Sequence, residues 1–157
     1  MFNFFKKKKS SNDLASPMDG NVIAITEVDD PVFASKAMGD GFAVEPENGA
    51  VYAPVVGKVT SIFPTKHAIG LLTAAGAEIL LHIGINTVDL GGEGFEILVS
   101  EGAAVDLDTK LAEVDLAYLQ QQNKPTTTMV IWANSGDATV NVKTGNATAK
   151  TVIGKLN

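Results

Sequence analysis

The sequence contains no cysteine and no arginine, and none of its apolar runs is long. Without cysteine the chain has no disulfide bond, no thiolate nucleophile and no zinc site built on cysteine, which agrees with a reducing compartment. Without arginine it has no planar guanidinium group for a two-point contact with phosphate, so any arginine in its chemistry must come from a partner. No uninterrupted apolar stretch reaches the roughly 18 residues that a membrane-spanning helix needs.

The N-terminus lacks the pattern of a secretion signal. Its opening residues, MFNFFKKKK, have the charges after the aromatic side chains and no apolar stretch that leads to a cleavage site. We therefore expect a cytoplasmic protein. Its 157 residues, 45% of them hydrophobic, suffice for one domain with a sizeable core.

Basic residues are few outside the N-terminus. All 12 are lysines, four of them at positions 6–9, so residues 10–157 carry eight lysines against 18 acidic side chains. Because nucleic acids are held by basic stripes, we expect no nucleic acid partner. The negative field of the body favours a basic protein partner instead.

Residues 1–13 differ in composition from the rest, and we separate them from a single domain at residues 14–157. Three of the seven phenylalanines precede the lysine run, and SSND follows it. The segment is either a flexible, solvated tail or a short amphipathic anchor that places its phenylalanines in an anionic membrane surface. In the second case residues 1–9 would make a weak, salt-sensitive contact, and the cytoplasmic protein would be membrane-associated.

Residues 14–157 show the pattern of β-structure, with short runs rich in Val, Ile, Thr and Phe between Gly, Pro or Asp/Asn turns. The pattern P-x-x-G-x-V-x-x-I occurs twice, at residues 17–25 and 54–62, and residues 101–114 show a similar turn followed by a strand. Helix is scarce, and its best candidate is a turn or two at residues 116–124. We predict an all-β fold, an antiparallel β-sandwich or barrel-sandwich with a duplicated motif.

The only two histidines belong to adjacent predicted strands. His82 interrupts the apolar run EILLHIGI, and His67 lies in FPTKHAIGLL, with Ala74-Ala75-Gly76 as the natural turn between them. A two-residue loop at Ala74-Ala75 would make the histidines direct cross-strand neighbours, and one at Ala75-Gly76 would make them diagonal neighbours on one face. Only an odd loop would separate them. We therefore predict a histidine pair.

A lone histidine on an apolar strand is most often a core residue, but a pair suggests a function. Two imidazoles in a partly apolar site lower each other's pKa, which leaves both neutral at pH 7. Three chemistries remain open: zinc binding, acid-base hydrolysis and phosphoryl transfer. Two histidines are too few for zinc, and no serine or cysteine nucleophile pattern accompanies them. In phosphoryl transfer one ring nitrogen would attack phosphorus while the other ring steadies the transferred group.

Four ordered stretches resemble the glucose-family IIA component of the bacterial phosphoenolpyruvate:sugar phosphotransferase system. They are PVFASKAMGDGFAV at residues 31–44, FPTKHA at 63–68, EILLHIGINTVDLGGEGF at 78–95 and EGAAVDLDTKLAEVD at 101–115. The resemblance covers about residues 14–157 and includes both histidines. It implies an all-β phosphocarrier that takes a phosphoryl group from phosphohistidine HPr and passes it to a IIB domain of a sugar permease. Regulatory protein targets are further expected partners.

The resemblance also implies roles for individual residues. His82 would be phosphorylated on Nε2, and its Nδ1 would donate to the carbonyl of Gly84. His67 would hydrogen-bond the phosphoryl oxygens, and Thr65 would orient His67. No metal or other cofactor is required, and a zinc ion at His67 and His82 would be adventitious or regulatory.

A docking surface for the partners is implied as well. Val32, Phe33 and Phe42 would contribute apolar contacts, and Asp30 would occupy one of two matching acidic positions; the acid at the other position would face an arginine of the partner. Members of the family often have an aspartate where this chain has Asn86, so we expect a reduced docking charge.

Two alternatives belong to other classes. One is a binding module of the same barrel-sandwich fold, either an unphosphorylated relative or a lipoyl or biotinyl carrier, although the lysine turn of such carriers is missing. The other is a zinc peptidase, which would need a second ligand two residues after His82, where the chain has Gly84.

Overall fold

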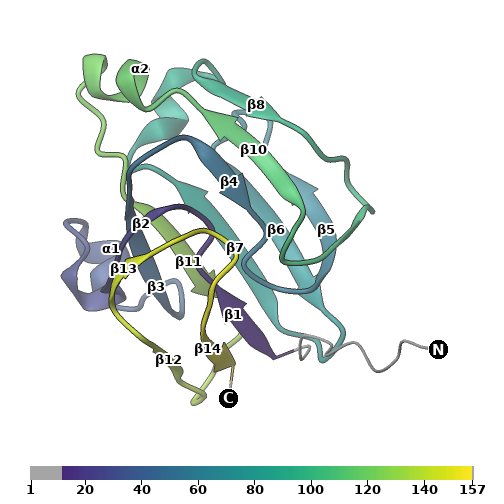
Figure 1. Ribbon diagram of the computed structural model, residues 1–157. Coiled ribbons are helices and arrows are strands. Elements are labelled where there is room, and N and C mark those ends of the chain that lie inside the picture. The colour runs from purple at the N-terminus through teal and green to yellow at the C-terminus, as the bar shows by residue number, and fades with distance from the viewer. Residues whose placement is uncertain (1–11, 157) are drawn as a thin grey trace.

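The computed structural model describes residues 12–156, and Figure 1 shows them as a β-rich body with the short helices α1 and α2 along one side. The expected membrane contact of residues 1–9 lies outside the described residues. Asp13, which we assigned to the N-terminal segment, opens the first strand, and its Oδ1 is 2.7 Å from Nζ of Lys155. Within residues 12–156, no helix is both long enough and apolar enough to cross a membrane.

Short strands are the main regular structure of the described chain. They are β1 (Asp13–Ala15), β2 (Gly20–Ala24), β3 (Asp40–Pro46), β4 (Ala50–Tyr52), β5 (Gly57–Ile62), β6 (Ala68–Thr73), β7 (Glu78–Ile83), β8 (Phe95–Ile97), β9 (Ala104–Val105), β10 (Lys110–Val114), β11 (Thr128–Trp132), β12 (Val140–Val142), β13 (Gly145–Ala147) and β14 (Val152–Leu156). The helical elements are η2 (Ile25–Glu27), α1 (Pro31–Ala34), η3 (Thr87–Leu90) and α2 (Leu116–Gln121).

The strands form three antiparallel sheets. The largest has the order β13-β2-β3-β11-β7-β6-β5-β9, and two smaller sheets have the orders β4-β10-β8 and β1-β14-β12. Figure 1 shows β4, β10 and β8 lying in front of the large sheet. The structure therefore confirms the predicted all-β, antiparallel sandwich with little helix.

The duplicated motif places one strand in each half of the large sheet. Gly20 begins β2 and Gly57 begins β5, so the glycine of each copy occupies the same position in its strand. A Cβ atom on Gly20 would collide with the carbonyl oxygen of Glu45, and one on Gly57 with that of Leu72. Both copies therefore need glycine because the backbone of the neighbouring strand approaches closely.

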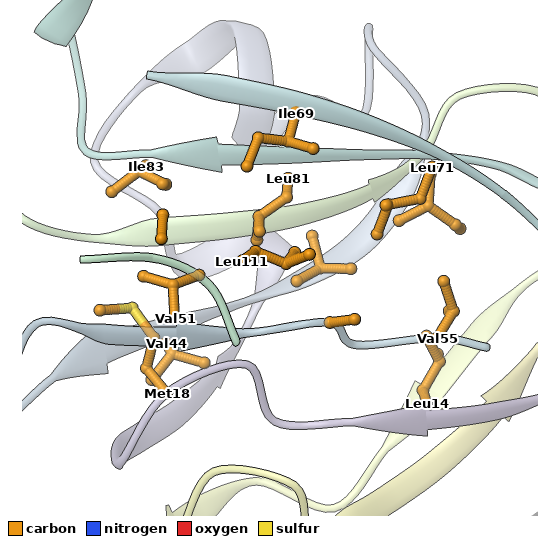
Figure 2. Close-up of a cluster of buried hydrophobic side chains, with 14 of the residues drawn as sticks. Leu14, Met18, Val44, Val51, Val55, Ile69, Leu71, Leu81, Ile83 and Leu111 are labelled. Atoms are coloured by element: carbon orange, nitrogen blue, oxygen red, sulfur yellow. The ribbon is translucent and has the colours of Figure 1, made fainter. Parts of the chain in front are cut away.

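The two faces of the large sheet pack into different clusters. Ile79, Leu81 and Ile83 of β7 point into the main core between the sheets, where Figure 2 shows Ile83 above Val51 and Leu81 close to Leu111. Residues at the alternate positions of β7 face the other way. On that side a second cluster packs beneath α1 and η2; its buried members are Ile25, Val28, Phe33, Ala43, Ile85, Met129 and Ile131. The side chain of His82 lies on this second face of the large sheet.

Of the helical elements, α2 falls inside the predicted range of residues 116–124. Oδ1 of Asp115 caps it by accepting from the backbone N–H of Tyr118 at 3.0 Å. The helix α1 was not predicted, because four residues are too few to show a helical period. Its signal was Asp30-Pro31, an N-cap residue followed by proline at the first helical position.

The predicted register of the β6–β7 hairpin is wrong. Ala68, not His67, is the cross-strand partner of His82, and Thr73 closes the turn by donating its N–H to the Ala77 carbonyl at 3.0 Å. The loop therefore contains three residues, Ala74-Ala75-Gly76. Gly76 has φ +94°, a left-handed value that favours glycine and allows the odd loop.

Candidate functional site

The two imidazole rings meet in spite of the odd loop. Their centroids are 4.9 Å apart and their planes are inclined at 81°. In a regular strand His67 would face away from His82, because Ala68 is the residue opposite His82. His67 instead lies in a bend before β6, after Lys66 with φ +63°, and this irregular backbone removes the strand alternation. The predicted histidine pair is confirmed, for a different geometric reason.

His82 lies in the middle of the large sheet, between Ala68 of β6 and Met129 of β11. Its Nδ1 is 2.9 Å from the carbonyl oxygen of Gly84. A carbonyl oxygen can only accept a hydrogen bond, so Nδ1 carries the proton and Nε2 keeps its lone pair. Gly84 has φ +79°, which turns its carbonyl back toward the ring.

His67 has its own orienting contact. Oγ1 of Thr65 lies 2.7 Å from Nδ1 of His67. A threonine hydroxyl can donate to this nitrogen, and His67 then carries its proton on Nε2, where it is available to an acceptor. The Phe63–Lys66 turn brings Thr65 into place, with Lys66 N–H donating to the Phe63 carbonyl at 2.7 Å.

Burial controls the protonation of both rings. The pKa of His82 is lowered to about 4, mainly by loss of hydration and to a smaller extent by the neighbouring His67, while the Gly84 hydrogen bond and Asp30 oppose the shift. Burial also lowers the pKa of His67. Both imidazoles are therefore neutral near pH 7, and His82 presents an unprotonated Nε2.

Two aromatic rings enclose the pair. The Phe33 ring is 5.0 Å from the His82 ring, and the Phe63 ring is 5.7 Å from the His67 ring with an interplanar angle of 74°. Phe63 is 39% exposed, so it forms part of the surface beside the histidines. Sequence reasoning did not assign Phe63 to the site.

The expected docking residues differ in exposure. Val32, on α1, is 50% exposed, and Asp30 caps that helix by accepting from the N–H of Val32 at 2.9 Å. Asn86 is exposed and has φ +61°. Phe33 is only 6% exposed and packs mainly beneath α1.

Phe42 requires a correction. Its side chain is 0% exposed and belongs to the main core, on the face of the large sheet away from His82. A partner at the surface cannot contact it, so its expected docking role is wrong. Val88 of η3 was not considered, but it is 50% exposed on the loop that follows Gly84.

The site offers few groups to a metal ion. Among residues 12–156 there is no group of three His, Asp or Glu side chains that could hold one. The chain itself supplies two imidazoles whose centroids are 4.9 Å apart, and the unprotonated Nε2 of His82 suits nucleophilic attack on an electrophilic atom.

The fold and the site together define a small antiparallel β-sandwich protein with a preorganised histidine pair. Residues 12–138 match the family model of the phosphoenolpyruvate-dependent sugar phosphotransferase system, EIIA 1. The chain belongs to this family.

Three known proteins are similar over nearly the whole chain. A glucose-specific EIIA component of Staphylococcus aureus is 42% identical over 150 residues, which cover 94% of this chain and 90% of that protein. A glucose-specific EIICBA component of Streptococcus pneumoniae is 47% identical over 152 residues, but these are 95% of this chain and only 21% of that protein. The solved glucose permease IIA of Mycoplasma capricolum is 38% identical, with a TM-score of 0.83 and 98% of both chains covered.

Proposed function

We propose that the chain is a phosphocarrier in which His82 accepts a phosphoryl group from phosphohistidine HPr and passes it to a IIB domain of a sugar permease. The observation that carries the proposal is the hydrogen bond of 2.9 Å between Nδ1 of His82 and the Gly84 carbonyl, with the His67 ring 4.9 Å away. The hydrogen bond leaves the Nε2 lone pair available as the nucleophile.

The transfer step exchanges one N–P bond for another. The Nε2 lone pair attacks phosphorus, the N–P bond of the donor breaks, and the donor ring leaves with the bonding electron pair. A donor ring that is protonated on its other nitrogen leaves as neutral imidazole. The phosphorylated His82 ring keeps its Nδ1 proton, and the Gly84 carbonyl oxygen stabilises the resulting positive charge.

His67 assists through its second nitrogen. With Nδ1 accepting from Thr65 Oγ1 at 2.7 Å, Nε2–H of His67 is free to donate to a phosphoryl oxygen. A donor fixed in place before the reaction stabilises the charge of the transition state without reorganisation. Thr65 therefore acts on the phosphoryl group through His67.

The surrounding surface suits a protein partner. Val32, Phe63 and Val88 are exposed apolar side chains, on α1, the Phe63–Lys66 turn and η3. Apolar contacts around the site exclude water, which would otherwise hydrolyse the phosphohistidine. Asp30 adds negative charge at the edge, for an arginine that this chain itself lacks.

The names of two relatives support a IIB partner. They are EIICBA components, from Streptococcus pneumoniae and Staphylococcus carnosus, and this chain spans about a fifth of their length. A cytoplasmic location, with or without membrane contact through residues 1–9, fits exchange with such partners. The transfer needs no cofactor; a zinc ion at His67 and His82 would take its remaining ligands from outside the chain.

The test is phosphorylation with phosphoenolpyruvate, enzyme I and HPr, followed by intact mass. We expect a gain of one phosphate, about 80 Da, that is lost in acid and retained in base. The His82→Ala variant should gain none. An unlabelled wild-type chain would overturn the proposal and favour a binding module of the same fold.

A further inference from the structure

The carbonyl that orients the His82 ring belongs to Gly84, and glycine has the fewest restrictions on its backbone conformation. Glycine populates left-handed and right-handed backbone conformations about equally, so Gly84 by itself does not fix the direction of its carbonyl. The hydrogen bond to Nδ1 of His82 therefore needs support from neighbouring residues.

Thr87 provides support on one side of Gly84. It is 0% exposed, and its Oγ1 donates to the carbonyl oxygen of Ile83 at 2.6 Å. Its methyl group, Cγ2, fills the space that a Cβ atom on Gly84 would occupy. The hydroxyl thus fixes the peptide plane that precedes Gly84, and the methyl group packs against the α-carbon of Gly84.

The backbone supports the other side. The Gly84 carbonyl and the Ile85 N–H belong to one peptide plane. The Ile85 N–H donates to the carbonyl oxygen of Pro125 at 3.1 Å, in the segment that follows α2. Ile83 in turn donates its N–H to the carbonyl oxygen of His67 at 2.7 Å, so the same short segment contacts both histidines.

We propose that Thr87 is a positioning residue for phosphoryl transfer, which holds His82 in the tautomer with the proton on Nδ1 by fixing Ile83 and Gly84. The inference rests on the proposed function of His82. Thr87 does not touch the reacting atoms, and its effect passes entirely through the direction of the Gly84 carbonyl.

Two variants separate the hydroxyl from the methyl group. Thr87→Val keeps the shape of the side chain and removes the donor, and Thr87→Ser keeps the donor and removes the methyl group. We expect Thr87→Val to accept phosphate from phosphorylated HPr about tenfold more slowly, less than the roughly hundredfold effect of a donor that contacts the transition state directly. Thr87→Ser should stay within about threefold of the wild type, because serine offers the same hydroxyl donor.

A spectroscopic readout distinguishes positioning from general loss of stability. The ¹⁵N chemical shifts of the His82 ring report which nitrogen carries the proton, without any phosphoryl donor present. The wild type and Thr87→Ser should show protonation at Nδ1, and Thr87→Val should show a mixture of the two tautomers.

Thr73→Val is the matched control. Thr73 is also buried, and its Oγ1 accepts from the Ala77 N–H at 3.0 Å, at the opposite end of the β6–β7 hairpin from His82. It should lose stability and keep the wild-type tautomer and transfer rate.

The outcomes are distinct. Wild-type rate and ring shifts in Thr87→Val would overturn the inference, and so would a Thr87→Ser variant as slow as Thr87→Val. Failure to label the wild-type chain would instead overturn the proposed function, and the ring shifts would still test the role of Thr87.

Discussion

Thr65 and His67 are joined by a hydrogen bond of 2.7 Å from Oγ1 to Nδ1, and His67 is buried beside His82. The bond links a turn residue to the second imidazole of the site. When the Thr65 hydroxyl donates, Nδ1 of His67 accepts and cannot carry a proton, so Nε2 is the ring nitrogen that can donate one.

Replacement of Thr65 by valine should therefore slow transfer without preventing it. Thr65→Val keeps the branched shape and removes the hydroxyl, so His67 loses its tautomer preference. We expect phosphoryl transfer to a IIB domain to slow by about tenfold, measured in single-turnover reactions. Thr65→Ser should retain the wild-type rate, and equally slow transfer by the serine variant would show that the hydroxyl is not the cause.

The two histidines should respond differently to substitution. His82→Ala should abolish labelling by phosphorylated HPr, because it removes the nucleophile. His67→Gln should still accept phosphate, since glutamine can donate to the phosphoryl oxygens, but it should pass the group on more slowly, by up to about a hundredfold. Equal labelling of the wild type and His82→Ala would reverse the assignment.

Strand positions and the meeting of the histidines could be predicted from the sequence, because they depend on local patterns. Glycine-led strands at Gly20 and Gly57 follow from the repeated motif, and both histidines lie near one hairpin. The register could not be predicted, because it depends on whether Gly76 adopts a left-handed backbone and adds one residue to the loop.

Exposure was harder to predict than position. Phe33 and Phe42 look alike in the sequence, yet Phe33 packs against the His82 ring and Phe42 points into the main core. The direction of each side chain depends on its element: Phe33 belongs to α1, and Phe42 belongs to the strand β3, which begins between the two residues. Phe63 lies at the start of a turn in which Lys66 has a left-handed backbone, and no apolar pattern in the sequence predicts this conformation.

The depressed pKa of His82 predicts a specific loss of stability in acid. The folded value is about 4, below the ordinary histidine value of 6.5. Between these values the unfolded chain binds a proton at His82 that the folded chain does not, so the contribution of His82 to stability falls as the pH drops from about 6.5 to about 4 and is constant below that window. The contribution is on the order of 3 kcal/mol.

Urea unfolding of the wild type and His82→Gln across this range measures the effect. As the pH falls, the free energy of unfolding of the wild type should decrease more than that of the glutamine variant. A parallel pH dependence in both chains would contradict the depressed pKa, and an NMR titration of His82 should show a midpoint near 4.

The exposed apolar side chains beside the site should matter for both partners. Val32→Asp places a charge on α1 next to His82, so binding of HPr and of a IIB domain should weaken together, each by about tenfold. Val152→Asp is the matched control, because Val152 is 42% exposed on β14, in a different sheet from His82. Titration calorimetry with each partner measures both effects, and a loss confined to one partner would rule out a shared docking surface.

Asn86 provides the last test, which concerns charge. Its left-handed backbone, with φ +61°, is tolerated by asparagine and aspartate more readily than by most other side chains. Asn86→Asp should therefore fold normally and add one negative charge beside the site. It should speed association with HPr at low ionic strength by about two- to threefold, and the gain should disappear near 1 M salt, where the Debye length is about 3 Å. Asn86→Gly, which keeps the backbone and adds no charge, should associate at the wild-type rate; an equal acceleration in the glycine variant would show that loss of the amide, and not the charge, is responsible.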